Sequence, residues 1–150
     1  MPEKKPSSID RARILLVEDH PIFRKGLREI INSEPGFEVV AECDDAPQAL
    51  RLAEELKPRL AIIDISLKNS NGIMLIKDMR RLFPHILVLT LSMHDEGIYA
   101  ERALRAGSRG YVMKHHPPEV VLQAIHQVLD GKIFVSDEIA HKIFTHFIEG

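Results

Sequence analysis

The stretch ILLVEDHPIF, residues 14–23, joins a buried-strand pattern to two adjacent negative charges. Four apolar residues run directly into Glu18 and Asp19, which are followed by His20 and Pro21. Proline suits the first turn of a helix, so the stretch predicts a strand followed by a helix. Two carboxylates at the end of that strand must be compensated by some other group, because like charges held close together disfavour folding.

The pattern of a strand followed by a helix occurs five times along the chain. The apolar, β-branched runs that read as strands are residues 13–17, 37–43, 60–64, 86–92 and 110–114. Strands that alternate with helices, at intervals of about 25 residues, predict βαβ units and a parallel sheet. The strands are almost continuously apolar, as expected when helices cover both faces. We therefore expect a doubly wound α/β sandwich of five strands and five helices.

The composition is that of one ordinary globular domain. Of 150 residues, 45% are hydrophobic and 28% charged, and the formal net charge of −2 does not favour binding to nucleic acid or to an anionic membrane. Cys43 is the only cysteine, so a disulfide framework and a CxxC metal site are excluded. Polar residues 1–10 are expected to form a flexible lead. No apolar run approaches the length of a membrane span, and we expect a cytoplasmic protein without membrane partners.

Carboxylates follow two strands that we expect to be neighbours. In the common doubly wound order 2-1-3-4-5, the strand order reverses between the first and third strands, and sites form at their carboxyl ends. The first strand ends in Glu18 and Asp19, and the third, LAIID, ends in Asp64. Taken singly, such acids often complement a helix end or cap a turn. Taken together, they favour a site for Mg²⁺, which prefers a few carboxylates, a carbonyl and several waters.

The fourth and fifth strands end in residues that can neutralise an anion. Ser92 offers a hydroxyl donor and Lys114 a positive charge, although each alone could be an ordinary strand end. Together with the carboxylates they are what a phosphoryl group on an aspartate would require. Asp64 would attack phosphorus, while the metal, the hydroxyl and the ammonium stabilise the phosphoryl oxygens.

These motifs resemble the receiver domain of a two-component response regulator, in the branch that carries LuxR/FixJ-type helix-turn-helix output domains. The stretches that carry the resemblance are LLVEDHPIFRKGL, DISLKNSNG, VLTLS and ALRAGSRGYVMK, followed by PPEVVLQAIHQVLDGKIFVS. They cover roughly residues 11–131 and imply a flavodoxin-like sheet of order 2-1-3-4-5. The resemblance also implies that Asp64 accepts a phosphoryl group from a sensor histidine kinase. Glu18, Asp19, Asp64 and the backbone carbonyl of Ser66 would bind Mg²⁺.

The resemblance assigns the remaining site residues as well. Ser92 and Tyr111 would form a conformational switch, and Lys114 would contact the phosphoryl group. For Tyr111, the alternative is simple packing at a strand edge with its hydroxyl in solvent. Lys68 stands where many receivers have proline, four residues after the acceptor. Lys68 and His94 are expected to line the route by which water reaches the acyl phosphate.

The tail beyond Gly131 resembles the linker that joins this type of receiver to its output domain. Ser136 can cap a helix whose first turn is acidic. The apolar residues expected on one face of that helix are Ile139, Ile143, Phe147 and Ile148. The predicted division is a lead at 1–10, a receiver at 11–131 and a linker helix within 132–150. DNA binding would belong to an output domain absent from this chain, and phosphorylation would promote a homodimer.

Two other functions compete with a phosphorylation-controlled regulator of transcription that is not itself an enzyme. A Mg²⁺-dependent haloacid-dehalogenase-like phosphohydrolase would carry its nucleophile in a DxD pair after the first strand, where this chain has Glu-Asp-His. A flavodoxin-like nucleotide binder would need a Ser/Thr/Gly-rich loop there, and two carboxylates would repel its phosphate. Both alternatives fit the residues less well than the receiver.

Overall fold

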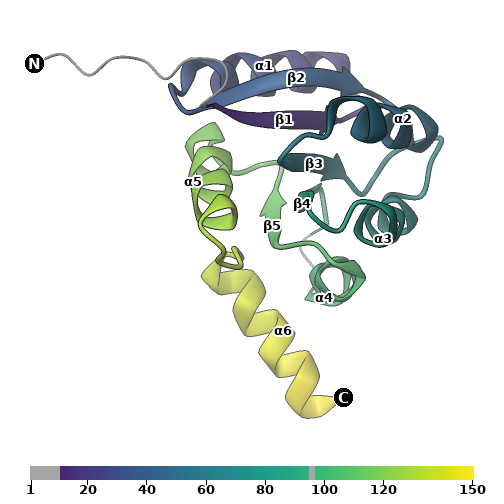
Figure 1. Cartoon of the computed structure of the whole chain (residues 1–150). Helices are drawn as coiled ribbons and strands as arrows, with labels where there is room; N and C mark the ends of the chain where they lie inside the picture. The colour runs from purple at the N-terminus through teal and green to yellow at the C-terminus, as the bar shows by residue number, and fades with distance from the viewer. Residues whose placement is uncertain (1–10, 95–96) are drawn as a thin grey trace, which may run out of the picture.

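The computed structural model describes residues 11–94 and 97–150; the expected flexible lead at 1–10 lies outside the described residues. Strands and helices alternate along the chain and end in one additional helix (Figure 1). The elements are β1 (Ala12–Val17), α1 (Pro21–Ser33), β2 (Phe37–Cys43), α2 (Ala46–Leu56), β3 (Leu60–Asp64), α3 (Gly72–Leu82), β4 (Leu87–Ser92), α4 (Gly97–Ala106), β5 (Gly110–Met113), α5 (Pro118–Leu129) and α6 (Asp137–Glu149).

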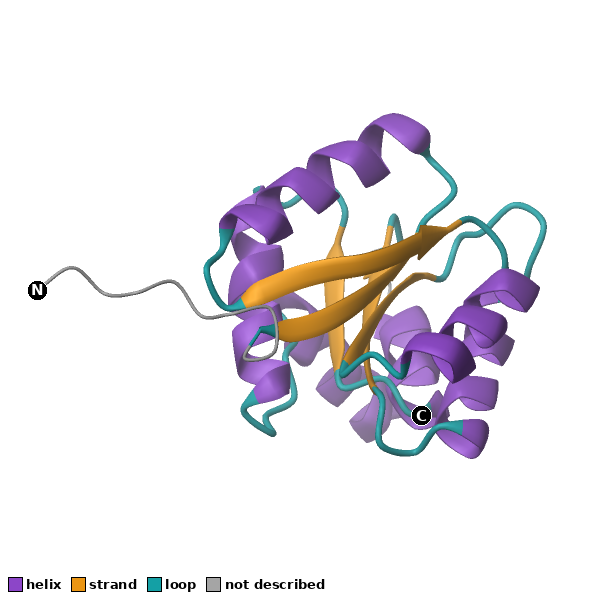
Figure 2. Cartoon of the chain, turned by 45° about the horizontal axis from the view of Figure 1, so that its top comes forward, coloured by secondary structure: helices purple, strands orange, loops and turns teal. Residues whose placement is uncertain are grey.

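The five strands form one parallel sheet of order β2-β1-β3-β4-β5, which confirms the predicted fold. Helices lie on both faces of this sheet (Figure 2). Alternate residues of β1 supply two separate cores: Ile14 and Leu16 pack with α1 and α5, whereas Leu15 and Val17 pack with α2, α3 and α4. All four side chains are buried, which is why the strand reads as a continuous apolar run.

The loop after β3 is fixed by polar capping and by one close approach. The side chain of Asn71 accepts a hydrogen bond from the amide of Met74 at 3.1 Å and so begins α3. A Cβ atom at Gly72 would lie 2.4 Å from Cα of Ile65, so only glycine lets α3 begin this close to the end of β3. The turn between β3 and α3 is thereby held against the carboxyl edge of the sheet.

The segment after α5 returns to the edge of the sheet. Phe134 forms a single parallel bridge with Gly110: its carbonyl accepts from the amide of Tyr111, and its amide donates to the carbonyl of Arg109, both at 2.9 Å. A parallel bridge of this kind partly covers the open edge of β5. The chain therefore leaves the five-stranded unit alongside β5.

Helix α6 then packs against α4. A Cβ at Gly97 would lie 2.8 Å from Cβ of Lys142, so the two helices approach closely at a glycine. Nδ1 of His146 lies 2.8 Å from a carboxylate oxygen of Glu101 on α4, and this contact adds a polar link. Ile139 is buried at the base of α6.

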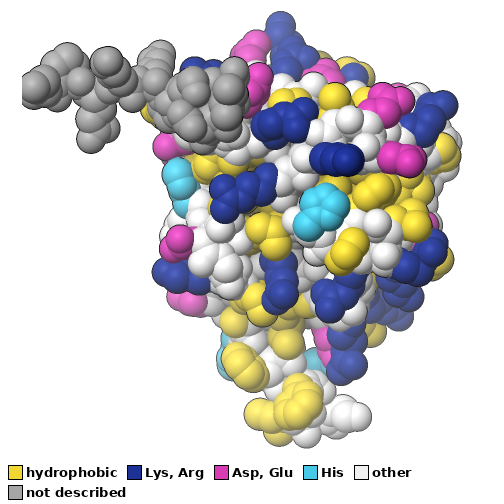
Figure 3. Space-filling model, viewed as in Figure 1, with side chains coloured by type: hydrophobic (Ala, Val, Ile, Leu, Met, Phe, Trp, Pro, Cys, Tyr) yellow, Lys and Arg dark blue, Asp and Glu magenta, His cyan; other side chains and the backbone are white. Residues whose placement is uncertain are grey.

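The outer end of α6 departs from the prediction of a single apolar face. Ile139 and Ile143 pack with the core, but Phe147 and Ile148 are 74% and 79% exposed, as is Phe144 at 65%. Figure 3 shows hydrophobic side chains gathered on this projecting end of the molecule. The predicted stripe therefore divides into a docked inner part and an exposed outer part. Among the described residues, no helix has the length and apolarity needed to cross a membrane.

Candidate metal and phosphoacceptor site

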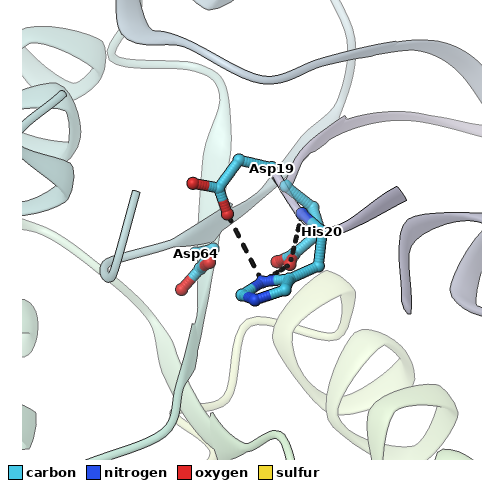
Figure 4. A group of neighbouring side chains, drawn as sticks. Asp19, His20 and Asp64 are labelled. Atoms are coloured by element: carbon cyan, nitrogen blue, oxygen red, sulfur yellow. Dashed lines mark hydrogen bonds and ion pairs between the residues drawn. The ribbon is translucent and has the colours of Figure 1, made fainter. Parts of the chain in front are cut away.

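The carboxyl ends of β1 and β3 bring the predicted acids together. Because Val17 of β1 pairs with Ile63 of β3, the residues that follow them in the chain emerge side by side. Glu18, Asp19, His20 and Asp64 each offer a ligand atom, and these atoms all lie within 4.8 Å of one another. Figure 4 shows the side chains of Asp19, His20 and Asp64 close together. The convergence expected at the switch point of the sheet is thus present.

Lys114 joins the acids to β5. Its Nζ lies 2.8 Å from Oε1 of Glu18 and 2.8 Å from Oδ2 of Asp64. Both carboxylates have no solvent exposure, and the lysine side chain is 9% exposed. The ammonium also lies 5.0 Å from the ring centroid of Phe23. One cation therefore bridges two buried anions from different strands.

Burial and charge act in opposite directions on these groups. Burial raises the pKa of Glu18 above its ordinary value of 4.5; the hydrogen bond from Lys114 opposes this rise, and the charge of Asp64 adds to it. Burial alone would lower the pKa of Lys114, but its hydrogen bonds to Asp64 and Glu18, together with their charges, raise it above 10.5. The pocket therefore holds more negative charge than one lysine compensates.

Two oxygens of this pocket point to a cation. Within residues 11–94 and 97–150, Oε2 of Glu18 and Oδ1 of Asp19 are buried and make no hydrogen bond. Buried carboxylate oxygens that make no hydrogen bond are costly, and a hard divalent ion would satisfy them. The residues present therefore fit Mg²⁺.

Backbone amides of the loop after β3 hold the other carboxylate oxygens. The amide of Ser66 donates to Oδ1 of Asp64, and the amide of Lys68 donates to Oδ2 of Asp19, both at 2.8 Å. A proline at position 68 could not make the second bond, because it has no N–H. The Lys68 side chain itself is exposed, so this residue orients Asp19 through its backbone.

Ser92 and Tyr111 meet at the loop that follows β4. Oγ of Ser92 accepts from the amide of His94 at 2.8 Å, and the Tyr111 hydroxyl donates to the His94 carbonyl at 2.6 Å. Tyr111 is only 1% exposed, so the alternative that places its hydroxyl in solvent is wrong. The His94 ring stacks on Tyr99 of α4 at 4.2 Å between centroids. Ser92 and Tyr111, the two expected switch residues, thus both hydrogen-bond to the backbone of His94 in the loop after β4.

His20 is the member of the ligand group that the sequence motifs did not single out. Its Nδ1 lies 3.2 Å from Oε1 of Glu18 and 3.4 Å from Oδ1 of Asp19. Its position directly after the acid pair was the available signal. No pattern of zinc-site spacing accompanies it, so a search by known metal motifs passes over it.

The comparisons with known proteins agree with this fold. The model of the response regulator receiver domain matches residues 14–126. The transcriptional regulatory protein DegU of Brevibacillus brevis is 30% identical over 138 residues, which are 92% of this chain and 58% of that protein. The chain thus spans less than two thirds of the length of this relative.

Solved structures of response regulators are similar to this chain as well. A two-component response regulator of the LuxR family from Aurantimonas sp. SI85-9A1 has a TM-score of 0.87 and 38% identity, covering 92% of this chain and 99% of that one. A structure of two RcsB dimers bound to two parallel DNAs has a TM-score of 0.81 and 25% identity, covering 89% of this chain and 68% of that one.

A doubly wound sheet of this order, with acids and a lysine at its carboxyl edge, defines a signal receiver, and the chain belongs to the response regulator receiver domain family. More narrowly, it is the receiver domain of a two-component response regulator of the LuxR type. This family is regulatory rather than catalytic. Its members generally bind Mg²⁺ at an acidic pocket and partner with sensor kinases. The phosphohydrolase and nucleotide-binding alternatives find no support.

The raised pKa of Glu18 leads to a prediction for Glu18→Gln. A carboxyl whose pKa is higher in the folded state makes that state hold more protons, so the wild type loses stability as pH rises from 4.5 towards the raised value. Glutamine cannot ionise, so without divalent ions the variant should gain in relative stability over this interval. Mg²⁺ should then stabilise the wild type more than the variant, because the variant lacks an anionic ligand.

Urea unfolding from about pH 4 to about pH 8, with chelator or with Mg²⁺, measures both effects. Exposed Glu29→Gln on α1 is the matched control for the loss of one carboxylate. A stability difference between Glu18→Gln and the wild type that does not change with pH would contradict the destabilising effect that we assign to the buried charge of Glu18.

Proposed function

We propose that Asp64 accepts a phosphoryl group from a sensor histidine kinase and thereby controls an output. The observation that supports this most directly is the position of Asp64 between Lys114 and the acid cluster. Its Oδ2 lies 2.8 Å from the lysine ammonium, and its carboxylate belongs to the ligand group of Glu18 and Asp19. Glu18 also contacts this ammonium at 2.8 Å and belongs to the same group, so it is the resemblance to receiver domains that favours Asp64 over Glu18 as the acceptor.

The transfer needs a nucleophile, neutralisation of charge and an approach for the donor. Asp64 forms a bond from a carboxylate oxygen to phosphorus as the bond between phosphorus and the donor histidine nitrogen breaks, and the imidazole leaves as a neutral ring after taking up a proton. The ammonium of Lys114 lies close enough to Asp64 to stabilise the negative charge on the oxygens of the incoming phosphoryl group. Mg²⁺, held by Glu18, Asp19, Asp64 and the carbonyl of Ser66, would neutralise the same oxygens when bound.

A hollow beside the acids gives the donor an approach. Its volume is about 330 Å³ and it lies over the lysine that contacts Asp64. The residues that line it are His20, Phe23, Met93, Lys114 and His115. Phosphoryl transfer and later hydrolysis at Asp64 are the only chemistry that we assign to the domain, which acts as a regulator and not as an enzyme on other substrates.

The output is proposed to be control of transcription. The relative DegU is a transcriptional regulatory protein, and the similar RcsB structure contains dimers bound to DNA. We assign residues 11–131 to the receiver and 132–150 to a linker helix that leads to a DNA-binding domain outside this chain. Phosphorylation would favour a homodimer. A cytoplasmic location agrees with the free, buried thiol of Cys43.

The acceptor assignment predicts that Asp64→Asn abolishes phosphorylation. Incubation with acetyl phosphate and Mg²⁺ should add one phosphoryl group to the wild type, seen as an increase in intact mass, and none to the variant, because an amide is not a nucleophile towards phosphorus. Asp78→Asn, in an ordinary helix-surface ion pair with Arg81, is the control and should label like the wild type. Equal labelling of Asp64→Asn and wild type would overturn the assignment.

The lifetime of the phosphoryl group should depend on Lys68 and His94, the residues proposed to line the path of water. Alanine at either position should change the rate of dephosphorylation several-fold while leaving the melting temperature nearly unchanged, because both side chains are at least partly exposed. The decay of phosphorylated protein after removal of the donor measures this rate. Lys25→Ala, exposed on α1, is the control. Unchanged decay in both variants would show that neither side chain lies on the path.

The switch prediction rests on the contacts of Ser92 and Tyr111. A phosphoryl group adds about −1.5 to −2 charges at Asp64 and should attract the Ser92 hydroxyl away from the His94 amide. The loop would then move, and Tyr111 with it, because its hydroxyl is bound to the carbonyl of His94. The surface of α4, β5 and α5 would change as the population shifts between two states.

Chemical shifts of residues 92–125, recorded with and without beryllofluoride, test this coupling. We expect changes that reach α5 in the wild type and remain near the pocket in Ser92→Ala. Tyr111→Phe removes only the hydroxyl and should also confine the changes. Identical changes in all three proteins would mean that the signal does not pass through these two hydroxyls.

A further inference from the structure

His20 occupies a helix-capping position without acting as a cap. It is the N-cap residue of α1, where Ser, Thr, Asp and Asn are preferred because their side chains accept from the first amides of the helix. The His20 side chain makes no such bond. Its ring instead turns towards the acids, and Figure 4 shows the imidazole beside the carboxylates of Asp19 and Asp64. The side chain is therefore used for the acid site and not for the helix.

The distances around Nδ1 of His20 fit hydrogen bonds to the acids and equally fit neighbouring ligands on one ion. This atom lies 3.2 Å from Oε1 of Glu18 and 3.4 Å from Oδ1 of Asp19. Ligands in adjacent positions of an octahedron with bonds of about 2.1 Å are about 3.0 Å apart. With Asp64, the four ligand atoms lie within 4.8 Å of one another, close to the span of a single coordination sphere.

Two further features support a ligand set rather than an ordinary polar cluster. Glu18 is fully buried, and its Oε2 has no hydrogen-bond partner among the residues described. The backbone amide of His20 donates to Oε1 of Glu18 at 3.2 Å, which fixes the start of α1 relative to the acid. The imidazole is thus attached to a backbone that is hydrogen-bonded to Glu18, next to a carboxylate whose second oxygen makes no hydrogen bond.

We propose that His20 is a metal ligand through Nδ1 and that it selects the ion: the site prefers Mn²⁺, and borderline divalent ions such as Co²⁺, over Mg²⁺. Imidazole is a common ligand of first-row transition metals; Mn²⁺ shares with Mg²⁺ a preference for oxygen ligands, but it accepts a nitrogen ligand more readily than Mg²⁺ does. A set of three carboxylates and one imidazole therefore adds affinity for Mn²⁺ that Mg²⁺ does not share. This inference rests on the proposed metal site of the phosphoacceptor and adds a fourth protein side chain to it.

His115 provides a matched control. It lines the same hollow as His20, but it is outside the ligand group and its ring stacks on His116 at 4.7 Å between centroids. Phenylalanine at either position keeps an aromatic ring and removes both nitrogens. Because His20 is 46% exposed in its side chain, His20→Phe should fold normally, and a thermal melt in chelator checks this.

The experiment has a spectroscopic and a thermodynamic part. Pulsed electron paramagnetic resonance of bound Mn²⁺ should show modulation from a directly coordinated nitrogen in the wild type and in His115→Phe, and none in His20→Phe. In titrations, His20→Phe should bind Mn²⁺ about tenfold more weakly, the size of effect typical for metal-site partners, with a much smaller change for Mg²⁺. Wild-type protein without nitrogen modulation, or an equal loss for both ions, would overturn the proposal.

Labelling by acetyl phosphate separates this inference from the proposed function. A wild type that is phosphorylated on Asp64 in Mg²⁺ but shows no nitrogen coupling to Mn²⁺ refutes the role of His20 alone. A wild type that binds Mn²⁺ through nitrogen but is not phosphorylated refutes the phosphoacceptor role and leaves the His20 ligand intact.

Discussion

The bridge from Lys114 to Glu18 and Asp64 is the interaction on which the rest of the site depends. It links the ends of β1, β3 and β5 through one ammonium group with two contacts of 2.8 Å. In a low-dielectric environment such a pair is costly to form and more costly to break, because removal of one partner leaves a buried charge without compensation. The bridge therefore fixes the relative positions of three strand ends, and with them the shape of the pocket.

The same bridge leaves the pocket short of positive charge. Glu18, Asp19 and Asp64 lie around one lysine, and two buried carboxylate oxygens make no hydrogen bond. A cation and a phosphoryl group have opposite effects on the net charge of the pocket: the cation reduces the negative charge, and the phosphoryl group adds to it. A site with compensated charge would respond weakly to either. The uncompensated negative charge lowers the stability of the fold, and the same charge would make the domain sensitive to a cation or a phosphoryl group in the pocket.

Sequence patterns predicted the parallel sheet, because it follows from apolar periodicity and the alternation of strands and helices. The strand order comes from the common doubly wound arrangement and from the resemblance to receiver domains, and the meeting of the acids follows from that order. Sequence patterns did not predict which way local groups point. The amide of Lys68 on Asp19, the Ser92 hydroxyl on the His94 amide and the imidazole of His20 depend on loop geometry that no periodicity encodes. The exposed outer end of α6 was missed for a related reason: an apolar stripe shows that a helix can be buried, but not how far its neighbour extends.

The single bridge at Phe134 has a mechanical consequence. Its carbonyl accepts from the amide of Tyr111 on β5, and Lys114 directly follows the end of this short strand. The start of the segment that leads to α6 is therefore tied directly to the backbone of β5. A displacement of β5 would act on this segment through the two backbone hydrogen bonds of Phe134, without a relay of side chains. The segment that leaves the domain is thus held against β5 and is not a flexible linker at this point. Helix α6 begins only a few residues beyond the attachment at Phe134.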